Sequence, residues 1–271
     1  KLRENSTHEA LKVKSVLKSL KTSCKILSWK GKKPIRNLQS VARKNRYALL
    51  ERQCNKDKVK TVLLGHHIDD MYENFFIRLS RGSGLNGLLS FYEIKKTRMG
   101  NLNILRPLIN ENKNDLIFTA KKVFNFYVID PSNYNENFKR IRFRKLISNI
   151  KKEGFDEKKF QLTLKNLKES NSSINFYVNR NILLNSKYSK QKAFCLLNSS
   201  FFNEANEVVF RSFSQILTNI GNRYYGARGK SISLILNKIR DEDFAKATLS
   251  GCIIEKISNS IKISKENNKK L

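Results

Sequence analysis

Residues 61–91 read TVLLGHHIDDMYENFFIRLSRGSGLNGLLSF, and the elements that this stretch predicts decide the fold. Its apolar opening, Thr61–Leu64, is closed by Gly65, which is typical of a buried strand that ends in a turn. Apolar residues then recur at helical spacing, which predicts an amphipathic helix with Asp69 as its N-cap. A glycine-rich basic loop, Arg81–Gly87, follows this helix.

Polar residues cluster where the predicted strand meets the predicted helix. His66, Asp70 and Glu73 are spaced i, i+4 and i+7, so they share one face if the helix begins early. Open α/β sheets bind anions and substrates at such a strand end, beside a helix N-terminus. Alternatives stay open, because histidines and carboxylates also bind metal ions or form hydrogen-bonded surface groups, and a loop such as Arg81–Gly84 is also found as a surface turn.

Residues 65–88, GHHIDDMYENFFIRLSRGSGLNGL, resemble the HHxDDxxE and RGSGxxGL signature of the bacterial tRNA(Ile)-lysidine synthases, which belong to the PP-loop ATP pyrophosphatase superfamily. Other segments match the same family: ARxxRY at Ala42–Tyr47, RPL…K from Arg106 to Lys113, and an arginine pair at Arg140 and Arg144 that follows an Asp-Pro-Ser-Asn turn at 130–133. Ile141 stands where the family usually has asparagine.

This resemblance implies an enzyme that replaces the C2 oxygen of cytidine 34, in the anticodon of isoleucine tRNA, with L-lysine. ATP first adenylates the oxygen, the lysine amine then attacks C2, and AMP leaves after pyrophosphate. The family's cofactors are ATP and Mg²⁺. Such a reaction needs fixed donors for the developing charge and an unstacked base.

The resemblance also assigns roles to individual residues. The expected catalytic and lysine-binding group is His66, Asp70 and Glu73. The expected cofactor-binding group is His67, Asp69, Arg81, Gly82, Ser83 and Gly84, with Asp69 either a Mg²⁺ ligand or a plain N-cap. The expected RNA-binding group is Arg43, Arg46, Arg106, Lys113, Arg140 and Arg144. Without the resemblance, Arg43, Arg46, Arg140 and Arg144 would be ordinary cations on solvated helix faces.

Strand and helix signals alternate up to about residue 150, with further strands predicted at 24–29 and 126–129. This order predicts an α/β fold with a doubly wound, mostly parallel sheet over residues 1–152, the PP-loop ATPase-like catalytic domain. Helices are then predicted at 156–170, 173–185, 204–221 and 230–240, with a small hairpin over 249–263. We therefore predict that residues 153–271 form a smaller, mainly helical tRNA-binding domain.

Family members carry an SGGxDS loop after their first strand, and its backbone amides cradle the pyrophosphate of ATP. No such segment occurs in these 271 residues, which begin at Lys1 and not at methionine. We therefore expect the catalytic domain to be N-terminally truncated in this chain. We also expect the chain alone to release no AMP.

Composition points to a polyanionic partner. The formal net charge is +31, and basic residues exceed acidic ones in both halves of the chain, which favours nucleic acid as the partner. A genome that favours Lys and Asn codons is an alternative source of part of this excess. The four cysteines are scattered, as expected for a reducing cytoplasm, and no apolar run is long enough for a membrane helix. A homodimer is a further expectation.

Two other functions remain in view. A tRNA 2-thiocytidine synthetase would share the ATP-dependent activation of the base, but the absence of a CxxC pair counts against it. The chain could also be a non-catalytic, basic RNA-binding remnant of the enzyme.

The charge generates the first testable prediction. If Lys and Arg residues of 153–271 contact phosphates, tRNA affinity should fall by several decades as salt rises over a moderate range, because bound counterions are released. Filter binding against a salt series measures this slope. Binding that ignored salt would contradict a tRNA-binding role for this region.

Overall fold

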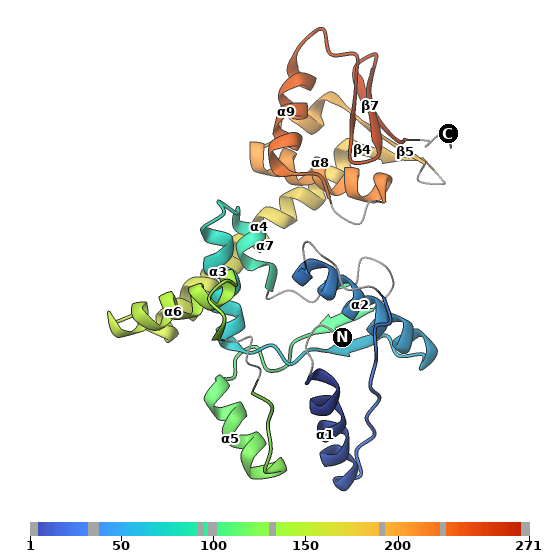
Figure 1. The fold of residues 1–271 in the computed structure, drawn as a ribbon. Coiled ribbons are helices and arrows are strands. Elements are labelled where there is room, and N and C mark those ends of the chain that lie inside the picture. Colours follow the sequence, from blue (N-terminus) through green and yellow to red (C-terminus); the bar gives the residue numbers. More distant parts are fainter. Residues whose placement is uncertain are drawn as a thin grey trace. The chain divides into compact units, whose positions relative to one another are not determined.

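The computed structural model describes residues 5–31, 38–91, 95–96, 102–129, 134–189, 193–222 and 226–266 (Figure 1). The chain divides into two compact units, residues 1–160 and 161–271. The first unit contains the region predicted as catalytic. The division lies eight residues after the predicted boundary at 152/153, and the two functional domain assignments stay predictions.

The first unit is built on a three-stranded sheet in the order β1-β3-β2. Strand β1 (Thr61–Leu63) pairs in parallel with β3 (Asn103–Leu105), and β2 (Lys95–Lys96) pairs antiparallel with β3. A parallel pair needs a crossover connection, and α3 (Ile68–Leu79) lies within it. The other helices of this unit are α1 (Ser6–Ser19), α2 (Leu38–Lys56), α4 (Leu85–Leu88), η1 (Leu89–Phe91), α5 (Lys113–Phe124) and α6 (Lys139–Lys152).

Helix α3 is the centre of the first unit's packing. It buries Ile68, Met71 and Tyr72, and it packs against α6, as Figure 1 shows. Its C-terminal half joins an aromatic cluster made of Tyr72, Phe75, Phe76, Phe155 and Phe160. Edge-to-face ring pairs of this kind add to the burial of apolar surface. The predicted amphipathic helix is confirmed, with its apolar face inward.

The second unit contains most of α7 (Glu157–Asn185) and a five-stranded antiparallel sheet in the order β4-β5-β8-β7-β6. The strands are β4 (Ser186–Tyr188), β5 (Phe194–Leu197), β6 (Lys246–Leu249), β7 (Cys252–Ile257) and β8 (Ser260–Lys265). The turn η3 (Ser199–Phe202) and helices α8 (Asn206–Gly221) and α9 (Gly229–Arg240) complete it. Helix α8 packs on this sheet and buries Phe213 and Ile216 in the core.

Gly221 closes α8 at a point of close backbone approach. A Cβ added there would lie 2.3 Å from the carbonyl oxygen of Ser250 and 3.0 Å from Sγ of Cys252. Real side chains do not tolerate the first distance, so only glycine fits against the turn between β6 and β7.

The α/β fold class is confirmed, while several individual elements differ from the sequence prediction. Residues 24–29 and 126–129 form no strands, because alternation alone does not make a strand without a neighbour to complete its hydrogen bonds. The hairpin predicted over 249–263 is part of a larger sheet. The predicted turn at 130–133 lies outside the described residues.

The helices predicted at 156–170 and 173–185 are one continuous helix, α7. Asn171 falls between the two predicted helices, but in α7 it is buried and its Oδ1 accepts a hydrogen bond of 2.6 Å from Nη1 of Arg211. Arg211 is itself buried, and its Nε donates to Oε1 of Glu207 at 2.7 Å. The polar side chain therefore supports the helix, because it satisfies a cation from α8.

None of the helices in the described ranges combines the length and the apolar character that a membrane crossing requires.

This network predicts that Asn171→Ala destabilises the fold. Losing the acceptor leaves Nη1 of Arg211 only its longer contact of 3.3 Å with Oδ1 of Asn175, so the free energy of unfolding should fall by about 1–3 kcal/mol. Urea denaturation measures the change, and Asn179→Ala on the exposed side of the same helix is the matched control. Equal stability of the two variants would show that the contact contributes nothing.

Candidate functional site

The site begins where the parallel strands β1 and β3 end. The Leu64 amide donates to the Leu105 carbonyl at 2.9 Å, so His66, two residues after Leu64, lies close to Arg106, which follows Leu105. Nε of Arg106 donates to Nδ1 of His66 at 3.2 Å. Phe91 lies beside both, with its ring centroid 5.0 Å from that of His66 and 4.8 Å from the Arg106 guanidinium.

The surroundings of His66 favour its neutral form. Burial lowers the pKa of His66 most, and the positive charges of Arg106, Arg43 and Arg140 lower it further. Asp70 acts in the opposite direction. These contributions come from Asp70 and from arginines on three separate elements, Arg43 on α2, Arg106 after β3 and Arg140 on α6.

The start of α3 carries the second histidine and two carboxylates. The helix begins at Ile68 with His67 as its N-cap, so the prediction of Asp69 as N-cap is wrong. The His67 amide donates to Oδ2 of Asp70 at 3.2 Å. The Asp70 carboxylate thus satisfies one of the backbone amides that have no partner within the helix at its N-terminus. Asp69 faces a cation of α6: its Oδ1 lies 3.7 Å from Nζ of Lys151.

Glu73 lies one turn further along α3 and is buried. Its side chain is 1% exposed, and its Oε1 accepts a hydrogen bond of 2.7 Å from Nε of Arg144 in α6. Its Oε2 is buried without a hydrogen-bond partner among the described residues. Burial raises the pKa of Glu73, and the Arg144 contact lowers it only in part, because a single oxygen is paired.

The glycine-rich loop follows α3 directly. Gly82 has φ +66°, a left-handed conformation that glycine adopts at little cost, and Arg81 is exposed beside it. The sequence prediction missed Arg78, which is half-buried at the base of the loop and accepts the Ser83 amide on its carbonyl at 3.1 Å. Burial lowers the pKa of Arg78, and Arg81 and Arg43 lower it further. Three arginines therefore gather near this loop.

The predicted RNA-binding arginines divide into two groups. Arg106 and Arg144 are engaged at the site, by His66 and Glu73 respectively. Arg43 is exposed on α2, where its guanidinium donates to the Tyr47 hydroxyl at 3.1 Å and lies 4.9 Å from the Tyr47 ring. Arg46 is exposed on the same helix.

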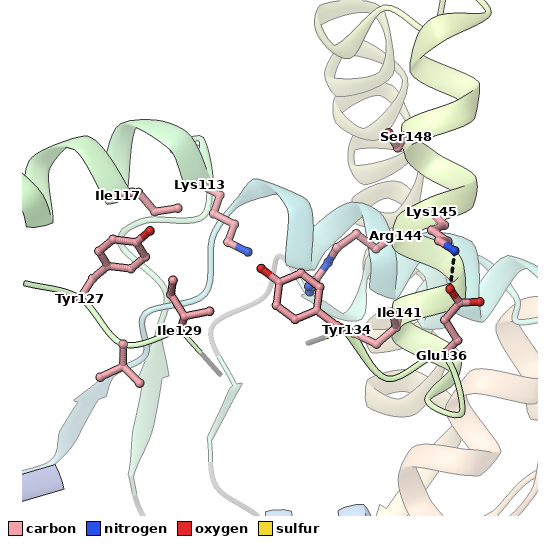
Figure 2. Close-up of a pocket in the computed structure, with 11 residues that line it drawn as sticks. Lys113, Ile117, Tyr127, Ile129, Tyr134, Glu136, Ile141, Arg144, Lys145 and Ser148 are labelled. Carbon is pink, nitrogen blue, oxygen red and sulfur yellow. Dashed lines mark hydrogen bonds and ion pairs between the residues drawn. The ribbon is translucent and has the colours of Figure 1, made fainter. Parts of the chain in front are cut away.

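A cavity of about 550 Å³ lies in the first unit between α5, the segment after it, and α6 (Figure 2). Lys113 and Arg144, both predicted RNA-binding residues, line it. Figure 2 shows the Lys113 amine and the Tyr134 ring directed toward the space near the Arg144 guanidinium. Its other lining residues are Ile117, Tyr127, Val128, Ile129, Glu136, Ile141, Lys145 and Ser148. Aromatic rings and cations around one space suit a planar, anionic group such as a nucleotide.

Within the described ranges, no group of three or more His, Cys, Asp or Glu residues could hold a metal ion. The carboxylates at the start of α3 are committed to the helix amide of His67 and to Lys151. These contacts do not test Asp69 as a Mg²⁺ ligand, and that role stays a prediction.

Comparison with known proteins gives consistent matches. A family model described as a PP-loop domain matches residues 1–150. Curated relatives named tRNA(Ile)-lysidine synthase include that of the Brugia malayi Wolbachia, 32% identical over 90% of this chain and 56% of the relative. That of Orientia tsutsugamushi is 32% identical over 94% of this chain and 58% of its own. That of Rickettsia felis is 30% identical over 100% of this chain and 62% of its own length. The chain thus spans about three fifths of these relatives' length.

The buried carboxyl of Glu73 predicts a pH dependence of stability. A carboxyl with a raised pKa in the folded state contributes stability that is present at low pH and lost as pH rises through that pKa. Lowering the pH from about 7 toward the ordinary glutamate value of about 4.3 should therefore stabilise the native chain relative to Glu73→Gln.

Urea denaturation of both proteins across this pH range measures the difference, with Glu169→Gln at an exposed position of α7 as the control. A difference that moved in the opposite direction would show that the Arg144 contact outweighs burial.

Proposed function

We propose that this chain, which belongs to the PP-loop domain family, is part of a tRNA(Ile)-lysidine synthase. The reaction is the ATP-dependent ligation of L-lysine to C2 of cytidine 34 in isoleucine tRNA, with release of pyrophosphate and AMP. The observation that carries the proposal is the gathering of His66, Asp70 and Glu73 with arginines from β3's end and from α6. Their spacing matches the HHxDDxxE signature of the family that the sequence resembles.

Asp70 is the group that contacts the lysine substrate. Its side chain is 17% exposed, whereas that of Glu73 is 1% exposed and already paired with Arg144. A carboxylate that keeps some exposure attracts an ammonium group more readily than one that is enclosed and neutralised. Glu73 then acts through Arg144, whose guanidinium it holds at the cavity.

The cavity beside Arg144 receives the tRNA nucleotide. An enzyme that modifies C2 must take the base out of its stack, and unstacked bases pack on aromatic side chains. Tyr127 and Tyr134 offer rings at this space, while Lys113 and Arg144 offer cations for a phosphate. Arg43, Arg46 and Arg140 extend the positive surface for the rest of the anticodon stem-loop.

ATP binds near the loop Arg81–Gly84, where Arg78 and Arg81 offer positive charge to phosphate oxygens. Fixed donors and cations in a partly buried site stabilise the charge that develops during adenylation. Mg²⁺, as cofactor, would neutralise phosphate charge, with Asp69 as the proposed ligand. A cytoplasmic location and a homodimer remain part of the proposal, to be checked by fractionation and sedimentation.

The direct test supplies the full-length protein that contains this chain with ATP, L-lysine and an isoleucine tRNA transcript. AMP and lysidine should form in equal amounts, and both should require tRNA and lysine. Mass spectrometry of the digested nucleosides identifies the product. A protein that bound the tRNA but formed neither product would contradict the proposal.

The Asp70→Asn variant then tests the lysine site. Loss of a charge-assisted contact should raise the KM for lysine roughly 10–100-fold, with a smaller effect on the KM for ATP. Asp243→Asn, an exposed substitution in the second unit, is the matched control. Unchanged lysine dependence in Asp70→Asn would reject the assignment.

A further inference from the structure

We propose that Arg106 is a positioning residue that holds His66 as a neutral imidazole protonated on Nε2, so that His66 donates a hydrogen bond to an oxygen of the activated substrate and does not act as a base. This inference deepens the proposed function and rests on it for the identity of the substrate. The state of the imidazole itself is a property of the chain's own residues.

The direction of one hydrogen bond carries the inference. A guanidinium stays protonated in proteins, so Nε of Arg106 can only donate. At 3.2 Å its partner, Nδ1 of His66, must therefore accept, and an accepting ring nitrogen carries no proton. A neutral imidazole keeps its proton on the other nitrogen, Nε2.

Packing fixes this arrangement. Arg106 lies over the ring of Phe91 at 4.8 Å, and the same ring lies 5.0 Å from the His66 ring, so one aromatic side chain orients both partners. Phe91 is 7% exposed, and a buried ring of this kind has little room to move. The pairing of β1 with β3 sets the backbones from which His66 and Arg106 project.

The surrounding charges favour the same state. Arg43, Arg106 and Arg140 each oppose a positive charge on His66, and burial opposes it more strongly. Asp70 alone among these groups favours protonation. These groups therefore favour the neutral imidazole, which is also the form that accepts the hydrogen bond from Arg106.

The chemical consequence is a division of roles. With Nδ1 occupied by Arg106 and Nε2 protonated, His66 has no lone pair available to take a proton from the lysine ammonium. It does have one N–H, on Nε2, the ring nitrogen that the bond to Arg106 does not use. A fixed N–H stabilises an oxyanion such as a phosphate oxygen of the adenylate as negative charge collects there on departure of AMP.

Nitrogen-15 NMR of histidine-labelled protein tests the tautomer directly. The chain has three histidines, His8, His66 and His67, so single substitutions assign every signal. We expect Nδ1 of His66 to show the shift of an unprotonated nitrogen and Nε2 that of a protonated one. In Arg106→Leu the two nitrogens should move toward each other, because the tautomers then exchange. Arg52→Leu on the exposed side of α2 is the matched control and should leave both signals in place.

Two results would overturn the inference: a native His66 protonated on Nδ1, or an unchanged tautomer in an Arg106→Leu protein whose other histidine signals show that it is folded. Arg106→Lys, which keeps the charge but not the guanidinium geometry, should restore the native tautomer only in part. In the ligation assay, Arg106→Leu should lower kcat by up to about 100-fold with little change in the KM for lysine. A fall in lysine affinity alone would also count against it. Because the NMR result needs no turnover, failure of the proposed ligation and failure of this inference are separable.

Discussion

One buried carboxylate determines how the first unit is assembled. Glu73 is enclosed between α3 and α6, and a buried charge destabilises a fold strongly unless a partner meets it with good geometry. Arg144 provides that partner, and this requirement fixes the register of the two helices. Three contacts run in opposite order along them: Lys139 with Ser80, Arg144 with Glu73, and Lys151 with Asp69. The helices are therefore antiparallel, and the cations of α6 are spread along α3, from Lys151 at its start to Lys139 at its end.

The sequence carried enough information to predict the centre of the site. A short apolar run followed by helical spacing gave β1 and α3. Both patterns are local, so they need no knowledge of distant residues. The shared helix face expected for His66 and Asp70 required an early start of the helix, whereas α3 begins at Ile68, after His66. The basic segments around Arg106 and Arg144 were also found, although only through their resemblance to a family.

Contacts between distant residues could not be read in the same way. Spacing placed Glu73 on a face of α3, but its burial depends on α6, which lies some seventy positions further along the chain. Asparagine is common in turns, but Asn171 is a buried residue of α7, where it accepts a hydrogen bond from Arg211 of the distant helix α8. Arg78 was missed because a basic residue in the last turn of a helix is ordinary, and only its burial against the loop distinguishes it.

The tight contact at Gly221 also bears on how this gene can drift. Every glycine codon begins with two guanines, whereas the codons for Lys and Asn begin with two adenines. Mutation pressure that enriches a chain in Lys and Asn therefore works against each glycine it encodes. At position 221 any replacement would bring a carbon to 2.3 Å from the Ser250 carbonyl oxygen. Selection should therefore remove variants that have lost this glycine codon. Its two guanines should be among the slowest-changing bases in the gene.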